Sequence, residues 1–97
     1  MNTRRATGTM TPTIGAASVN IYCSTGRIKQ IFLQSTSGNT TFDTTLTDDN
    51  DNVVYSTEDS TQELNEMLDV PAYLNYTLAI ENSSADEAFD YIVMIEE

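Results

Sequence analysis

Residues 74–81, LNYTLAIE, carry an apolar side chain at every second position. The apolar positions are Leu74, Tyr76, Leu78 and Ile80. Strict alternation over seven or more residues predicts a β-strand with one face in a core and the other in water. Residues 89–96, FDYIVMIE, repeat the pattern. These two segments predict a β-sheet protein whose sheets are each wet on one side.

Similar runs recur along the chain at about the 8–12-residue spacing typical of an all-β sandwich or barrel. They cover residues 19–24, 27–34, 42–47 and 53–55, and turn-forming clusters at 24–26 and 35–39 separate them. We therefore predict an all-β fold, an antiparallel β-sandwich of jelly-roll or Ig-like type with about six to eight strands. At 97 residues the chain forms one domain, which we place at residues 16–97.

One segment departs from the alternation. Residues 60–63, STQE, match a helix capping box, and Leu64, Met67 and Leu68 follow at helical spacing. Pro71 would then stop the helix. We predict one short helical connector over about residues 61–68, with a strand-like connection as the competing interpretation because two turns of helix are marginal without packing.

The first fifteen residues are rich in threonine, and Met10 and Ile14 are their only sizeable apolar side chains. That composition is poor for a core and predicts an extended N-terminal arm over residues 1–15. The opening MNTRRATGTMTPT has no apolar stretch after its basic pair, so no secretory signal is expected.

The charges are unevenly distributed. The net charge is −11, with all four basic residues within the first 29 positions and all 15 acidic residues from Asp43 onward. An acidic body repels nucleic acid and anionic membranes, so neither is an expected partner. The basic N-terminus predicts attraction between neighbouring copies, and the alternative interpretation is that the charge only keeps the protein soluble.

The chemistry of enzymes has little basis in this composition. The chain has no histidine and one cysteine, Cys23, which excludes histidine triads and zinc sites built from histidine or several cysteines. Cys23 falls on the apolar side of its strand and is expected to be a buried small side chain. No stretch approaches the roughly 20 apolar residues of a membrane-spanning helix. We predict neither an enzyme nor a cofactor.

The run TDDNDN at residues 47–52 has two interpretations. Asp48, Asn50 and Asp51 supply oxygen atoms of the kind that calcium prefers, which makes them a weak calcium candidate. However, an EF-hand loop needs glycine at its sixth position, and that position here is Val53. Asp and Asn also favour turns, because their side chains bond to nearby backbone. We favour a hairpin loop without metal.

Tyrosines could form a contact surface. Tyr76 and Tyr91 share the alternation of core positions, whereas Tyr22 and Tyr73 fall on the opposite face of their strands. Tyr22 and Tyr73 are therefore the surface candidates for binding a partner.

A resemblance adds a more specific expectation. Residues 28–35, 42–48, 53–55, 64–71, 75–82 and 89–93 read IKQIFLQS, FDTTLTD, VVY, LNEMLDVP, NYTLAIEN and FDYIV. This order of strands and turns resembles small β-sandwich proteins of tailed-bacteriophage virions, the capsid decoration (cement) proteins and related head accessory proteins. The resemblance covers about residues 27–95 and has no diagnostic motif.

The resemblance implies a virion protein that is assembled in the host cytoplasm and stabilises an icosahedral shell from its outer surface. Its partners would be the major capsid protein and neighbouring copies of itself. Residues 1–15 would be an arm that reaches a neighbour through Arg4, Arg5, Met10 and Ile14. The alternative hypothesis is a carbohydrate- or calcium-binding β-sandwich module of an adhesin or tail accessory.

Overall fold

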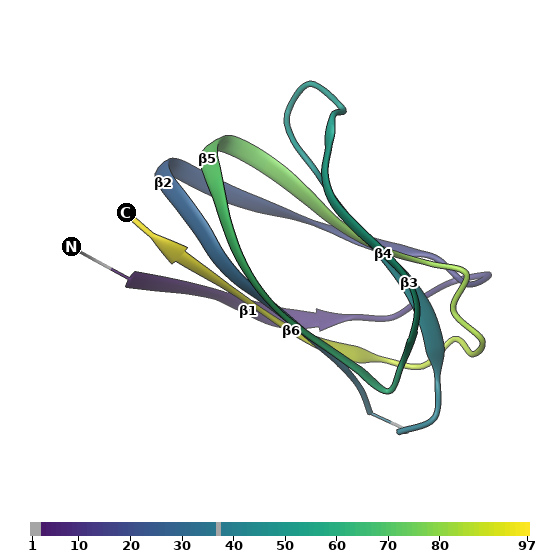
Figure 1. The fold of residues 1–97 in the computed structure, drawn as a ribbon. Helices are drawn as coiled ribbons and strands as arrows, with labels where there is room; N and C mark the ends of the chain where they lie inside the picture. The colour runs from purple at the N-terminus through teal and green to yellow at the C-terminus, as the bar shows by residue number, and fades with distance from the viewer. Residues whose placement is uncertain (1–2, 37) are drawn as a thin grey trace.

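The computed structural model describes residues 3–36 and 38–97, apart from the side chains of Ser24 and Tyr73. These residues form six β-strands and no helix (Figure 1). The strands are β1 (Thr3–Met10), β2 (Ala17–Ser35), β3 (Thr41–Thr47), β4 (Val53–Thr61), β5 (Glu63–Glu81) and β6 (Phe89–Glu96). Every pairing between them is antiparallel, which confirms the all-β prediction. None of the described residues belongs to a helix that could cross a membrane.

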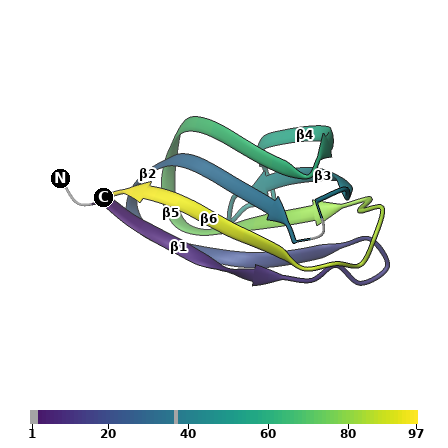
Figure 2. The same ribbon diagram turned by 90° about the horizontal axis from the view of Figure 1, so that it is seen from below.

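One continuous sheet, in the order β1-β6-β2-β5-β3-β4, folds over into two layers. The two 19-residue strands, β2 and β5, pass from one layer into the other. Residues 26–34 of β2 pair with residues 63–72 of β5, whereas residues 17–23 pair with residues 74–80. With each long strand counted as two, the sheet comprises eight segments in two layers (Figures 1 and 2).

The first layer contains β1, β6, residues 26–35 of β2 and residues 63–72 of β5. The second layer contains residues 17–23 of β2, residues 74–81 of β5, β3 and β4. Figure 2 shows β1 and β6 side by side, with β3 and β4 together elsewhere in the fold. We call these the first and second layers below.

The bend in β2 depends on Gly26. Its φ of 143° is one that residues with a side chain rarely adopt, and an added Cβ would lie 2.3 Å from the carbonyl oxygen of Glu96. The pairing with β5 shifts between Cys23 and Gly26, and Leu74 has a positive φ of 66° at the matching point of β5. The turn predicted at residues 24–26 is therefore a bend within one strand, because pairing with β5 continues on both sides of it.

The core lies between the layers and is built from alternate residues of the strands. Its largest fully buried side chains come from both layers: Phe42, Phe89, Ile21, Ile28, Ile31, Leu33, Leu46, Leu78, Ile80, Ile95 and Val93. Phe42 of β3 and Phe89 of β6 meet edge to face, with ring centroids 4.7 Å apart and planes at 74°. This contact joins the second layer to the first in the geometry that aromatic pairs prefer.

A bulge explains the imperfect alternation of residues 27–34. Ile28 and Ile31 are three residues apart, yet both are fully buried. The register of β2 with β5 and with β6 shifts between Ile28 and Gln30. An extra residue at this point lets both isoleucines face the core.

The predicted helix at residues 61–68 is wrong. Thr61 ends β4, Gln62 turns the chain with a φ of 68°, and β5 begins at Glu63. The backbone N–H of Gln62 donates to the carbonyl of Thr40 at 2.9 Å. Residues 63–67 then pair with residues 30–34 of β2. This ladder outweighs the local capping pattern, since two turns of helix have little stability of their own.

An N-terminal arm separate from the sandwich is not confirmed. Residues 3–10 form β1, which pairs with β6 without a register shift from Thr3↔Glu96 to Met10↔Phe89. The ring of Tyr91 occupies the space beside Gly8, where an added Cβ would lie 2.7 Å from its hydroxyl oxygen. Threonine is β-branched and suits an edge strand, so a composition poor for a core is still suited to a sheet.

Thr44 supplies a test of the core. It is fully buried between Phe42 and Leu46 on β3, and its hydroxyl has no hydrogen-bond partner among the described residues. Because an unpaired buried hydroxyl costs about 1–3 kcal/mol, we expect Thr44→Val to raise the free energy of unfolding by about 1 kcal/mol. Urea denaturation measures this change. Thr45→Val, at the neighbouring half-buried position, is the matched control and is expected to change stability by less than about 0.5 kcal/mol.

Candidate contact surface

The outer face of the first layer carries large apolar side chains. In β6, Val93 and Ile95 are buried, so Ile92 and Met94 face outward. Phe32 of β2 faces outward in the same way and, like them, is half-buried. On β5, Met67 faces outward with 69% of its surface exposed. We call Phe32, Met67, Ile92 and Met94 the apolar face.

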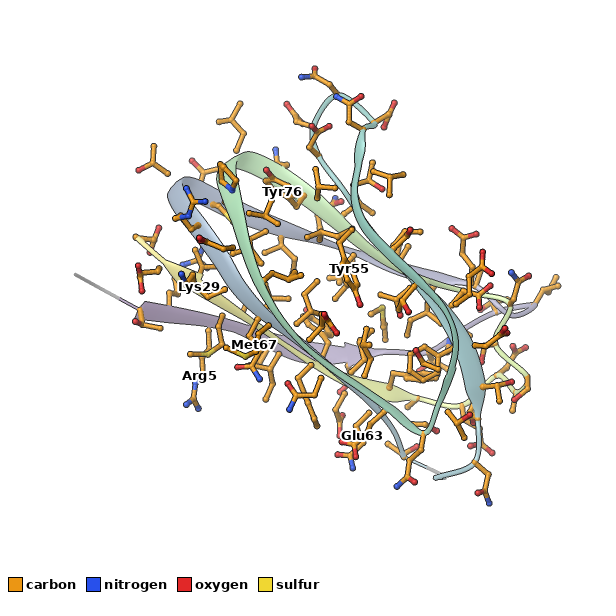
Figure 3. All side chains as sticks on the ribbon, in the orientation of Figure 1. Arg5, Lys29, Tyr55, Glu63, Met67 and Tyr76 are labelled. Atoms are coloured by element: carbon orange, nitrogen blue, oxygen red, sulfur yellow. The ribbon has the colours of Figure 1, made fainter. Side chains whose placement is uncertain are left out.

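Strand register brings these residues together in two rows. Gln30 of β2 lies between Met94 of β6 and Met67 of β5, and Arg5 of β1 lies opposite Met94. The adjacent row places Phe32 between Ile92 and Asn65. Arg5, Gln30, Phe32, Ile92 and Met94 line one hollow of about 270 Å³. Figure 3 shows Arg5 and Met67 on the same side of the molecule.

The outer face of the second layer has a different character. On β2, β3 and β5 its outward residues are Ser18, Asn20, Tyr22, Asp43, Thr45, Thr47, Asn75, Thr77, Ala79 and Glu81. On β4, exposed Val53 pairs with Thr47 and is the large aliphatic side chain of this face. Polar pairs cross its strands: the Thr77 hydroxyl donates to Asn20 Oδ1 at 3.2 Å. The Asn82 amide donates to Asp43 Oδ2 at 2.8 Å. This face is therefore suited to contact with water, and the two sides of the molecule differ in polarity.

Three of the four basic residues have acidic partners within the chain. Arg4 Nε lies 3.3 Å from Glu97 Oε1. Arg27 and Lys29 both contact Asp69 Oδ1, the lysine at 3.2 Å, and their hydrogen bonds hold the pKa of Asp69 below its ordinary value of 3.8. Arg5 forms no ion pair with any residue that the structure describes. A cation without an ion pair among the described residues therefore borders the apolar face.

The structure separates the residues expected to form one binding arm. Arg5 joins the hollow on the first layer, whereas Arg4 also donates from Nη2 to the backbone carbonyl of Tyr22. Met10 is 6% exposed and belongs to the core, so it cannot serve as an arm contact. Its burial follows from the pairing of β1 with β6, which places Met10 opposite Phe89.

Ile14 is 94% exposed, at the tip of the turn between β1 and β2. Its φ is 52°, and the backbone N–H groups of Ile14 and Gly15 donate to the two carboxylate oxygens of Asp86 at 3.1 and 3.0 Å. Asp86 thus fixes the turn and leaves the Ile14 side chain in water. Ile14 stays a candidate contact at a site separate from the apolar face.

Tyr22 is not brought together with Arg5. Tyr22 is 58% exposed and lies on the second layer, where it pairs with Asn75. The side chain of Tyr73 lies outside the described residues. Tyr76 is a core residue as predicted, and its hydroxyl donates to the carbonyl of Pro71 at 2.5 Å.

The TDDNDN run forms the hairpin loop between β3 and β4. Asp48 Oδ1 accepts the backbone N–H groups of Asn50 and Asn52, each at 2.9 Å, and Asp48 Oδ2 accepts the side-chain amide of Asn52 at 3.3 Å. Asp51 adopts a φ of 64° that completes the turn. Both carboxylate oxygens of Asp48 therefore hold the loop. The described residues include no group of three or more Asp, Glu, Cys or His side chains arranged to hold a metal ion.

Cys23 is fully buried, and burial raises the pKa of its thiol above the ordinary value of 9.0. The nearby charge of Arg4 lowers this pKa to a smaller extent. The thiol is therefore protonated near neutral pH, which agrees with the expected role of a small core residue.

Alternation alone missed the apolar face. The signal lies in runs in which successive residues are all apolar, so that both faces of the strand are apolar: IFL at residues 31–33 and IVMI at residues 92–95. A strand with water on one face shows polar residues at every second position, so such a run indicates that its outer face is also covered. Met67 gave no such signal because the segment around it was interpreted as a helix.

No protein-family model matches the chain, and no curated protein matches it at a significant level.

The Asp48 loop gives a pH prediction. The backbone N–H of Asn52 is the main cause that holds the pKa of Asp48 below its ordinary value of 3.8, so the folded state binds fewer protons than the unfolded state. Stability from this group is present above about pH 4 and is lost as the pH falls through the lowered pKa. We expect Asp48→Asn to lose less stability than the wild type between about pH 5 and pH 2, because asparagine keeps an acceptor that does not titrate.

Urea unfolding at several pH values within this range measures the difference. Asp49→Asn is the matched control, since it removes a charge from the same loop without removing the acceptor of the turn, and it is expected to follow the wild-type profile. An Asp48→Asn profile with the wild-type slope would contradict the assignment.

Proposed function

We propose that this chain is a structural protein of a tailed-phage virion, a capsid decoration protein that binds the outer surface of the icosahedral shell through its apolar face. The composition of that face carries the proposal. Protein interfaces are enriched in methionine, aromatic residues and arginine and depleted in lysine, aspartate and glutamate at their centre. Met67, Met94, Phe32 and Arg5 fit this description, in a chain whose net charge is −11.

The order of the strands supports the same class of protein. Numbered along the chain, the eight segments follow 1-8-3-6 in the first layer and 2-7-4-5 in the second. This order supports a jelly roll, in which an antiparallel ribbon with pairs 1·8, 2·7, 3·6 and 4·5 is rolled into two sheets. Jelly rolls occur in viral capsid domains and in lectins. A fold does not define a function, so our choice between these two uses rests on the apolar face.

The face favours a protein partner over a sugar. Among the described residues, Phe32 is the only aromatic side chain that lines its hollow, and it has no hydrogen-bonding group; Ile92 and Met94 lie beside it, with Arg5 and Gln30 as the two polar side chains. Sugars present many hydroxyl groups, whose burial against such side chains would cost free energy. The shell as partner is supported by the resemblance of residues 27–95 to decoration proteins.

The two outer faces would have different roles in decoration. The apolar face would lie against the major capsid protein, with Arg5 available to a carboxylate of the shell. The polar face of the second layer would stay in water, where its acidic charge keeps particles apart. Each contact can be modest, because many copies bind a repeating lattice and their contacts act together. The protein would be located on the virion surface after assembly in the host cytoplasm.

Binding to shells tests this proposal. The purified protein is mixed with phage heads assembled without it, the heads are sedimented, and the bound fraction is measured. We expect Met67→Glu and Ile92→Glu to weaken binding by at least about tenfold, because buried apolar contacts near the centre of an interface carry most of its free energy. Asn75→Glu, which introduces the same charge on the polar face, is the matched control and is expected to bind as the wild type does.

Urea unfolding shows whether each of the three variants is folded. If wild-type protein does not sediment with the heads, the decoration role is rejected, and glycan-array binding would then favour the lectin use of the fold. If Asn75→Glu reduces binding while Met67→Glu does not, the wrong face has been assigned.

A further inference from the structure

The first layer has an open edge at β1. β1 ends the sheet, and beyond it no strand pairs among the described residues. Thr36 donates its backbone N–H to the carbonyl of Ala88 at 3.1 Å. This bond shows which residues of β6 bond to β2, the even-numbered ones, and therefore which bond to β1, the odd-numbered ones. Because bonding direction alternates along antiparallel strands, Ala6, Gly8 and Met10 bond toward β6. Thr3, Arg5, Thr7 and Thr9 therefore direct their backbone N–H and C=O groups outward.

The opposite edge of the same layer is the first half of β5. Ser35 donates its backbone N–H to the carbonyl of Gln62 at 2.8 Å, so Leu64 and Glu66 bond toward β2. Glu63, Asn65 and Met67 therefore direct their backbone groups outward. The strand directions alternate across the four strands of this layer, so β5 runs antiparallel to β1. If one copy is placed beside the next, β1 meets β5 in the antiparallel direction.

The charges at these two edges are complementary. β1 contains Arg5, the cation without an acidic partner in the described residues, and no acidic residue. On β5, Asp69 already contacts Arg27 and Lys29. Glu63 is exposed and forms no ion pair with a described residue. Opposite charges across neighbouring strands stabilise their pairing.

The two edges of the second layer are less suited to strand addition. The register of β4 with β3 shifts twice, between Phe42 and Thr44 and between Leu46 and Thr47. Asp59, in the first of these bulges, has a φ of 58°. On the β2 edge, Arg4 already occupies the carbonyl of Tyr22. Bulges and covered backbone groups are the means by which proteins block edge strands.

We propose that copies of this chain associate head to tail through antiparallel pairing of β1 of one copy with residues 63–67 of β5 of the next, with Arg5 and Glu63 as the charged pair. The pairing continues the first layer from copy to copy and places the apolar faces side by side. Because the two contacting edges differ, the contact is heterologous and builds a closed ring or an open chain. The inference does not depend on the shell, since the protein alone carries both edges.

The mass of the purified protein, measured by light scattering over a range of concentrations, tests this inference. We expect species heavier than the 10.7 kDa of one chain. Arg5→Glu and Glu63→Arg should each return the mass to that of one chain. The double variant, Arg5→Glu with Glu63→Arg in the same chain, restores opposite charges and should recover the association. Asp49→Arg, the same charge change as Glu63→Arg but in the β3–β4 loop, is the control and should associate as the wild type does.

Thr7→Pro tests the backbone contact separately. Thr7 directs its N–H away from β6, so proline at this edge position removes only the donor that the next copy would use. We expect Thr7→Pro to be folded and monomeric, whereas Thr7→Val should still associate. Far-UV circular dichroism and urea unfolding show which variants are folded.

Three outcomes would overturn the inference. The first is a wild-type mass of one chain up to about 1 mM, a concentration at which a contact with a Kd of about 1 mM or tighter would populate a complex. The second is association that persists in folded Arg5→Glu and Thr7→Pro. The third is a folded double charge variant that stays monomeric. Because shells are absent from this measurement, its failure leaves the sedimentation test of the decoration role unaffected.

Discussion

The pairing of β2 with β5 is the constraint on which the rest of the structure depends. These two strands pair almost from end to end, and both change layer at the shift between Cys23 and Gly26. Their bend turns one sheet into two layers and closes the core between them. The register of this pairing also determines which side chains face outward, because a shift by one position would turn every later side chain to the opposite face of the sheet. Gly26 is central to this arrangement because its backbone conformation and the nearby carbonyl of Glu96 leave no room for a side chain.

The layers produced by this bend have unlike outer faces. Asn20 and Thr77 bond to each other across the second layer, whereas Phe32, Ile92 and Met67 occupy the matching area of the first. Folding leaves the apolar face exposed to water, whereas contact with a partner would bury it. The proposed association of β1 with β5 adds to this, since it would align the apolar faces of several copies on one side. A shell with repeating contacts is the kind of partner that suits such a surface.

Much of the fold could be predicted from the sequence, because each buried strand face leaves a period of two. Residues 74–81 and 89–96 and the sandwich itself followed from that period. The interpretation of residues 61–68 as a helix failed, since capping residues and apolar spacing are local signals and pairing with β2 is not. The N-terminal arm is not confirmed, for a related reason: threonine-rich β1 is held in the sheet by its pairing with β6, which lies far along the chain. The bulge at Ile28–Gln30 also depends on partners that no local pattern specifies.

The candidate surface was harder to predict than the fold. Arg5 was identified for its charge, and its proximity to Met94 and Phe32 depends on register across three strands. Met10 was predicted to contact a partner, but it belongs to the core. Its burial was not predicted because alternation in a strand with small polar neighbours gives little sign of which face is buried. The loop at Asp48 was predictable, since its turn uses side chains and backbone only four residues apart.

The most direct measurement of the central claim is the rate at which hydrogen peroxide oxidises Met67 in free protein and in protein bound to phage heads. Thioether oxidation follows exposure. Met67 is 69% exposed and Met10 is 6% exposed, so Met10 serves as an internal reference that should react slowly in both states. We expect Met67 to react several times more slowly on the heads. Equal rates of Met67 oxidation in the free and bound protein would show that the apolar face is not the surface that meets the shell.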